Sequence, residues 1–212
     1  MRPLLFSGDI EASGPVTPTY SMISVGYCLA DDTRVTFYAE LAPISDKYVE
    51  AAMRIGCRGL ACVREHAGDP RFDPHGDLFD PAAVLAELER TAERPIDAIL
   101  RLAQWVSSVS SRREGAPTAL YAPSSFESGF LPYYFDTFNN GVNPFGHSAW
   151  DAESYLRGAT GNDSASLSGL GQRPTDGLMH HALDDAIAQA NEFHIARKIA
   201  NENRIRHGLY RR

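Results

Sequence analysis

The side chains best suited to chemistry lie in two short segments near the two ends of the chain. Asp9 and Glu11 stand two residues apart, shortly after the apolar run 3–6. Alternate side chains of a β-strand project from the same face, so a strand here would direct both carboxylates at one point. Near the other end, His180 and Asp185 open an apolar-periodic segment. Carboxylates together with an imidazole indicate a magnesium or manganese site with a general base.

Two neighbours of these residues compete for the same roles. His181 and Asp185 are four residues apart on a predicted helix, so they could form a surface ion pair. Asp184 is rotated by about 100° from Asp185 around that helix, and both cannot face one metal ion. Helix geometry alone therefore leaves the choice between Asp184 and Asp185 open.

Apolar and turn patterns predict the elements that position these side chains. The predicted strands cover residues 3–12, 20–30, 34–41 and 118–121, with a fifth short strand or turn after residue 146. Predicted helices cover 48–64, 82–94, 95–108, 126–138, 151–156 and 181–206, and Ser124 and Ser125 are expected to cap the fourth. Residues 65–81 and 157–177 are predicted to be loops. Strands that later alternate with helices indicate a layered α/β or α+β fold.

Composition limits the class of protein. With 212 residues, 43% hydrophobic and 22% charged, we expect one globular domain over residues 1–212. The net charge of −7 argues against strong nonspecific binding to nucleic acid, although local Lys or Arg residues and metal ions can hold a 3′ end. Cys57 and Cys62 lack zinc-type spacing and are expected to be buried or free thiols. Without a signal-peptide pattern or a run of about 20 apolar residues, a cytoplasmic protein with no membrane partner is expected.

The motifs resemble those of the DnaQ-like 3′–5′ exonucleases of the DEDDh type, in the ribonuclease H-like superfamily. The first motif is similar to the segment Asp-Ile-Glu-Ala-Ser-Gly that starts at Asp9. The third is similar to His180-x-Ala-Leu-x-Asp185-Ala, followed by Gln189 and Ala190. Where the second motif is expected, the chain has Ser-Phe-Glu127, then Phe-Leu at 130–131 and a family-like segment 143–151. The resemblance covers nearly the whole chain in the right order.

The resemblance implies an α/β fold of the ribonuclease H-like type, with a five-stranded mixed central sheet flanked by helices. It implies two Mg²⁺ or Mn²⁺ ions, with Asp9 bridging both, Glu11 and Asp185 completing the first, and Glu127 supporting the second. His180 would take the proton from the attacking water, a role that suits its ordinary pKa of about 6.5. The implied function is hydrolysis of phosphodiester bonds at the 3′ end of DNA or RNA, releasing nucleoside 5′-monophosphates.

One residue departs from the family pattern. Glu127 stands where the family carries aspartate, and the extra methylene moves the carboxylate by about 1.5 Å, a shift to which metal sites are sensitive. Two alternatives therefore stay open: a catalytically impaired nuclease-like protein that binds nucleic acid or acts as a scaffold, and an enzyme of this fold that degrades oligonucleotides. The expected partner is single-stranded or 3′-ended nucleic acid. The sequence leaves a homodimer open.

Further residues have two interpretations each. The resemblance places Ser13 and Gly14 against the terminal nucleotide, whereas a turn that needs small residues would explain them equally well. Phe126 and Phe130 could contact a base or sugar, although their helical spacing favours the core. Asp151 could orient a site residue or cap its helix.

Other charged residues are expected to be solvated. The loop residues His66, Asp69, Asp73, His75 and Asp77 match no metal-ligand spacing. The basic C-terminal residues Arg197, Lys198, Arg204, Arg206, Arg211 and Arg212 are typical of the end of a helix, where the helix dipole favours positive charge.

Overall fold

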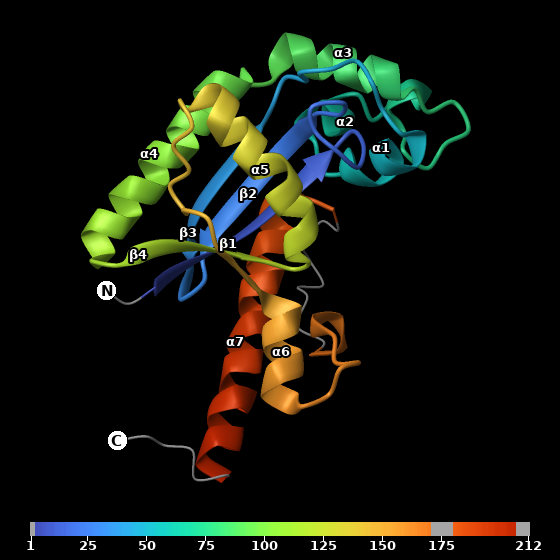
Figure 1. Cartoon of the computed structure of the whole chain (residues 1–212). Helices are drawn as coiled ribbons and strands as arrows, with labels where there is room; N and C mark the ends of the chain where they lie inside the picture. The colour runs from blue at the N-terminus through green and yellow to red at the C-terminus, as the bar shows by residue number, and fades with distance from the viewer. Residues whose placement is uncertain (1–2, 171–179, 207–212) are drawn as a thin grey trace.

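The computed structural model describes residues 3–170 and 180–206. Its centre is a five-stranded sheet in the order β3-β2-β1-β4-β5, shown in Figure 1. The strands are β1 (Pro3–Ala12), β2 (Met22–Leu29), β3 (Asp32–Glu40), β4 (Ala116–Tyr121) and β5 (Ala149–Asp151). The first three pair antiparallel, whereas β4 runs parallel to both β1 and β5. The mixed five-stranded sheet that the resemblance implied is confirmed.

The two faces of β1 pack against different layers of the protein. Phe6 and Ile10 point into a core packed by α4 (Pro95–Arg113) and α5 (Ser124–Phe138). Leu5 belongs to a second core on the opposite face, and Ser7 hydrogen-bonds a residue of α7 (Ala182–Arg206) there. Because side chains alternate along a strand, Asp9 and Glu11 share the α7 face.

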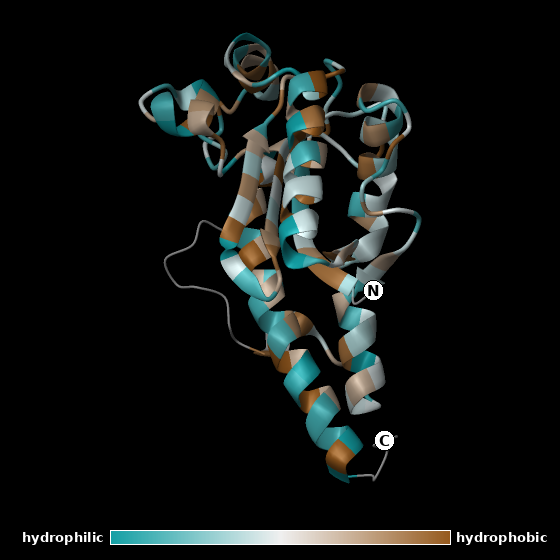
Figure 2. Ribbon diagram, turned by 90° about the vertical axis from the view of Figure 1, so that its left-hand side faces the viewer, coloured by the Kyte–Doolittle hydropathy of each residue, from teal (hydrophilic) through white to brown (hydrophobic). Residues whose placement is uncertain are grey.

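Helix α7 lies across β1 and β2 and continues past the sheet, where it packs against α6 (Ala152–Thr160). Figures 1 and 2 both show this helix pair extending beyond the strands. The buried residues of α7 are mostly alanines, and Phe193 is the largest of them. Small side chains allow the helix to approach the sheet closely, so its first turn can lie beside β1.

The predicted helix 48–64 is wrong in extent. It is two short helices, α1 (Glu50–Gly56) and α2 (Ala61–Glu65), because Gly56 and Gly59 flank a turn between them. With α3 (Pro81–Thr91) they enclose a third core next to the C-terminal end of β1. The remaining predicted elements occur with shifted ends, and the predicted loops 65–81 and 157–177 contain the short 3₁₀ helices η1 (Pro70–Phe72) and η2 (Leu167–Leu170). Residues 171–177 of the second loop lie outside the described residues.

Among residues 3–170 and 180–206, no helix has the length and apolar character needed to cross a bilayer.

Candidate active site

One cavity is lined by the four acids and the histidine that the resemblance assigned to the active site. The cavity has a volume of about 380 Å³, and its lining includes Asp9, Glu11, Glu127, His180 and Asp185. These residues come from β1, α5 and the start of α7, three elements that are far apart in the chain. The sheet brings them together because β1 and β4 run parallel, so the end of β1 and the start of α5 meet at the same edge.

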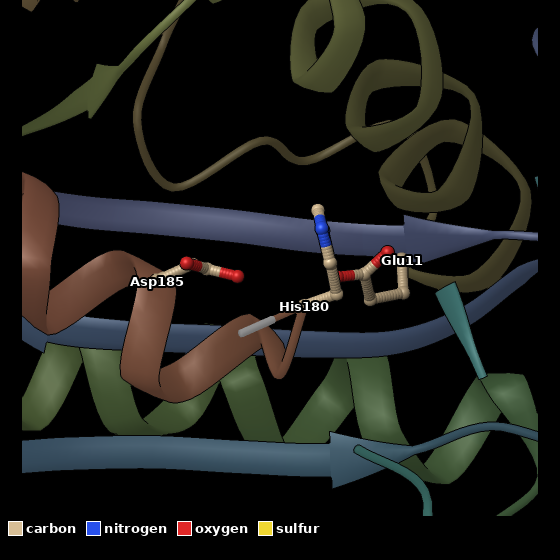
Figure 3. A group of neighbouring side chains, drawn as sticks. All are labelled: Glu11, His180 and Asp185. Carbon is tan, nitrogen blue, oxygen red and sulfur yellow. The ribbon is translucent and has the colours of Figure 1, made fainter. Parts of the chain in front are cut away.

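The tightest group contains three of these residues. Ligand atoms of Glu11, His180 and Asp185 all lie within 4.8 Å of one another. Figure 3 shows the three side chains between strand β1 and the first turn of α7. His180 has a φ of 62°, a left-handed conformation that is unusual for a residue with a side chain. Such strain is tolerated where the surrounding structure holds the residue in place, and it is concentrated at functional sites.

A glycine on the neighbouring strand permits this approach. Gly26 of β2 pairs with Asp9, and a Cβ atom added to Gly26 would overlap the backbone of Ala182 and Leu183. Any larger residue would therefore push the first turn of α7 away from the sheet. The absence of a side chain at position 26 sets how close Asp185 comes to the acids of β1.

Glu127 occupies the opposite wall of the cavity. Its side chain is 2% exposed, and its Oε2 atom makes no hydrogen bond to the described residues. Burial, with an addition from Asp151, raises the pKa of Glu127 from 4.5 to about 7. A buried carboxylate oxygen without a donor is costly. A bound cation would compensate for that cost.

Asp151 links Glu127's helix to α6. Its Oδ1 accepts a hydrogen bond from the Ser154 backbone N–H at 2.7 Å, and its Oδ2 accepts one from the Ser124 N–H at 2.8 Å. The first bond supports the capping alternative for Asp151. The second shows that the predicted caps of α5 were wrong: Ser124 and Ser125 make no cap bond, since the side chain of Asp151 already satisfies the first turn.

The pKa of Glu11 is also strongly raised. Burial is the main cause and Asp185 adds to it, so that the pKa of Glu11 rises from 4.5 to about 8, although Arg58 opposes the shift. Two carboxylates this close resist ionising together. Protons or a divalent cation must compensate for the repulsion at neutral pH.

The donor set fits divalent metal ions. It offers carboxylate oxygens from several elements, one imidazole, and the unpartnered Oε2 of Glu127 at the cavity wall. Oxygen-rich sites of this kind suit Mg²⁺ and Mn²⁺. The residues that would hold such ions are Asp9, Glu11, Glu127 and Asp185.

Three of the four residues expected to contact substrate have structural roles. Ser13 is fully buried, where its Oγ donates to the Lys47 carbonyl at 2.9 Å and accepts from the Ser21 N–H at 2.9 Å. Gly14 is buried against the ring of Tyr20. These bonds support the alternative of a turn that needs small residues.

The two phenylalanines Phe126 and Phe130 of α5 lie in different surroundings. Phe130 is 0% exposed and belongs to the core beneath the sheet, so we assign it a packing role. Phe126 is partly buried and lines the cavity beside Glu127. Phe126 is therefore the aromatic side chain positioned to meet a ligand.

The other histidine and acids that the sequence offered as metal ligands make contacts of their own. The Nδ1 atom of His181 lies 3.3 Å from Oδ2 of Asp184, and its ring packs on Tyr38. In the polar loop, Asp69 and Asp80 cap η1 and α3. Within the described part of the chain, the group suited to a metal is Glu11, His180 and Asp185. All three cysteines are buried free thiols, as expected for Cys57 and Cys62.

Further polar side chains line the cavity that were not predicted as site residues, although Gln189 was noted in the third motif. Gln189 and Glu192 follow Asp185 by four and seven residues, which places them on the same face of α7. Glu153 comes from α6 and pairs with Arg157 at 2.8 Å. Helical spacing from Asp185 was the signal that could have identified the first two.

Comparison with known proteins supports the resemblance. No family model matches the chain. The 3′–5′ DNA exonuclease Cap18 of Escherichia coli is 29% identical over 211 residues, which cover 96% of this chain and 97% of that protein.

Solved structures share the fold at low sequence identity. The nuclease domain of 3′hExo, a DEDDh family member bound to rAMP, has a TM-score of 0.58 and 14% identity, covering 93% of this chain and 92% of that one. A 3′-exonuclease in complex with the histone mRNA stem-loop that it recognises has a TM-score of 0.60 and 14% identity. The match covers 93% of this chain but 63% of that exonuclease. The chain is thus a nearly full-length homologue of a 3′–5′ DNA exonuclease and has the fold of the DEDDh 3′-exonucleases, as its motifs predicted.

Proposed function

We propose that the chain is a metal-dependent 3′–5′ exonuclease, acting as a single domain over residues 1–212. It hydrolyses the phosphodiester bond at a 3′ end and releases a nucleoside 5′-monophosphate. The observation that carries this proposal is the single cavity lined by Asp9, Glu11, Glu127, His180 and Asp185. The full-length homologue is a 3′–5′ exonuclease, which supports the same reaction here.

The acids hold the cations and the substrate phosphate together. When bound, two Mg²⁺ or Mn²⁺ ions neutralise the developing phosphate charge and lower the pKa of water. Asp9, on the central strand, would serve both ions, as the resemblance implies. Glu11 and Asp185 would hold one ion, and Glu127 would support the other with its buried Oε2.

His180 acts as the general base. Its imidazole lies within 4.8 Å of carboxylate oxygens of Glu11 and Asp185, beside the acids that would hold the cations. The neutral ring nitrogen takes the proton of the nucleophilic water as it attacks the phosphorus. The left-handed backbone at His180 holds the ring at the cavity rather than along the helix.

The substrate is nucleic acid with a free, single-stranded 3′ end. DNA is the first substrate to test because the full-length homologue is a DNA exonuclease; RNA stands beside it because one structural neighbour binds rAMP. Phe126 at the cavity wall offers a ring on which a base can stack. The three free thiols fit a reducing compartment such as the cytoplasm.

Digestion of labelled 3′-overhang DNA and matching RNA, with Mg²⁺ and with Mn²⁺, tests the proposal. Asp9→Ala should abolish release of mononucleotides, and His180→Ala should lower kcat by about 10²–10⁴-fold. Asp184→Asn is the matched control, because Asp184 is next to Asp185 in the chain but faces His181. Its rate of mononucleotide release should stay near that of the wild type.

Three outcomes separate the alternatives. No mononucleotide release by wild type, and none by Glu127→Asp, would favour a binding or scaffold protein. Rapid cleavage of two- to five-residue oligomers with poor cleavage of longer strands would favour an oligonucleotide-degrading enzyme. Undiminished activity in both alanine variants would overturn the site assignment. Light scattering on the same samples tests the homodimer that the sequence left open.

A further inference from the structure

Gln189 links α7, which carries Asp185, to strands β1 and β4. It lies on α7, four residues after Asp185, is 6% exposed and lines the cavity. Its Nε2 donates to Ser7 Oγ at 2.8 Å and to the Leu120 carbonyl at 2.9 Å, with the Gly8 carbonyl at 3.4 Å. A primary amide has two N–H groups, so both are used, one toward β1 and one toward β4.

A second bond closes the network onto the helix. Ser7 Oγ, which accepts from Gln189, donates its own proton to the Ala186 carbonyl at 2.8 Å. Ala186 directly follows Asp185. The side chain of Gln189 and the hydroxyl of Ser7 therefore join the backbone of α7 to the backbone of both strands through bonds that use both N–H groups of Gln189 and the O–H of Ser7.

The attachment points lie beside the metal-binding acids. Ser7 and Gly8 directly precede Asp9 on β1. Leu120 is near the end of β4, from which the chain passes into α5 and Glu127. Buried networks that are fully satisfied fix a single arrangement of the parts they join.

We infer that Gln189 is a positioning residue for the metal site: its amide sets the spacing between Asp185 on α7 and the acids carried by β1 and α5. The inference rests on the proposed function, because it concerns the same cations. Metal ligands must be held within about 0.5 Å of their productive geometry, and residues that orient ligands typically change metal affinity by about 10–100-fold when removed.

Calorimetric titration of the substrate-free full chain with Mn²⁺ tests the inference. Gln189→Leu and Gln189→Met keep the volume but remove both donors, and we expect each to weaken Mn²⁺ binding by about 10–100-fold. In the nuclease assay, the half-saturating Mn²⁺ concentration should rise by a similar factor. The kcat at saturating Mn²⁺ should stay close to wild type, because every ligand is intact.

Asn203→Leu is the matched control. Asn203 also lies on α7 and uses its amide to bridge helices, donating to the Ala159 carbonyl at 2.8 Å, but it lies far from the cavity. Both kinds of variant should lower Tm by about 2–8 °C. Only the Gln189 variants should change Mn²⁺ affinity.

A third variant covers the case in which Gln189→Leu fails to fold. Ser7→Ala cuts the link from Gln189 to Ala186 with a smaller change, and it should weaken Mn²⁺ binding in the same direction. Wild-type Mn²⁺ affinity in folded Gln189→Met and Ser7→Ala would overturn the inference while leaving the proposed function intact. Failure of the wild-type chain to bind Mn²⁺ would instead overturn the proposed function.

Discussion

At the scale of single residues, Glu127 shows how the longer acid is accommodated. The family pattern has aspartate at this position. Here the helix α5 starts at Ser124 and is held there by Asp151, so Glu127 projects into the cavity wall with Oε2 buried and without a donor among the described residues. An acid in this setting favours a cation as its partner.

Phe126 and Phe130 give a prediction that separates ligand contact from packing. Phe130→Ala removes a fully buried ring and should lower the free energy of unfolding by about 3–5 kcal/mol, with little effect on KM in the fraction that stays folded. Phe126→Ala should raise KM for a 3′-overhang substrate by about ten-fold through loss of base stacking, with a smaller loss of stability. Urea denaturation and initial-rate kinetics measure the two effects. Equal KM values for Phe126→Ala and wild type would remove Phe126 from the substrate site.

At the scale of elements, the spacing between α7 and β2 controls the site. Gly26 leaves no room for a Cβ beside Ala182 and Leu183. Gly26→Ala should therefore displace the first turn of α7, which carries His180 and Asp185, and lower both Tm and Mn²⁺ affinity. Differential scanning fluorimetry with and without Mn²⁺ measures both quantities.

Gly158→Ala is the control for that experiment. Gly158 lies inside α6, and no heavy atom lies within 4 Å of an added Cβ. Because alanine favours a helix over glycine, this variant should stabilise the protein by up to about 1 kcal/mol and leave Mn²⁺ binding unchanged. If Gly26→Ala behaved like Gly158→Ala, the close approach would have no functional consequence.

At the scale of the whole molecule, the buried acids make the stability of the metal-free protein depend on pH. The pKa of Glu11 rises from 4.5 to about 8 and that of Glu127 from 4.5 to about 7, chiefly through burial. Above pH 4.5 the unfolded chain releases protons that the folded protein keeps up to these values. The folded state then binds more protons, so the free energy of unfolding falls as pH rises, by up to about 1.4 kcal/mol per pH unit for each group.

Urea denaturation in EDTA from pH 5 to pH 8 should show this decline. Glu11→Gln and Glu127→Gln should each flatten it, whereas the exposed Glu202→Gln should not. Added Mn²⁺ should restore more stability at pH 8 than at pH 5, because metal binding favours the ionised acids. A stability that rises steadily from pH 5 to pH 8 without metal would contradict the described burial of the two acids.

Local patterns in the sequence predicted the strands and the long C-terminal helix. Asp9 and Glu11 share a face because strand side chains alternate, and Asp184 and Asp185 cannot face one metal ion because helix residues rotate by about 100° each. Such periodicities depend only on neighbours in the chain. The choice of Asp185, and the identification of Glu127, came from the resemblance to the family motifs. The order of the motifs supplied the rest of the fold.

Tertiary structure alone decided which partners meet across long separations. The Oγ of Ser13 bonds to the backbone of Lys47 and Ser21, Asp151 accepts from the first residue of α5, and Gln189 joins β1 and β4 to α7. Periodicity shows which side of an element a residue occupies but not which element packs against it. Hydrogen bonds across the sheet depend on distances that are set when the layers close, and those distances make four carboxylates and a histidine into one site.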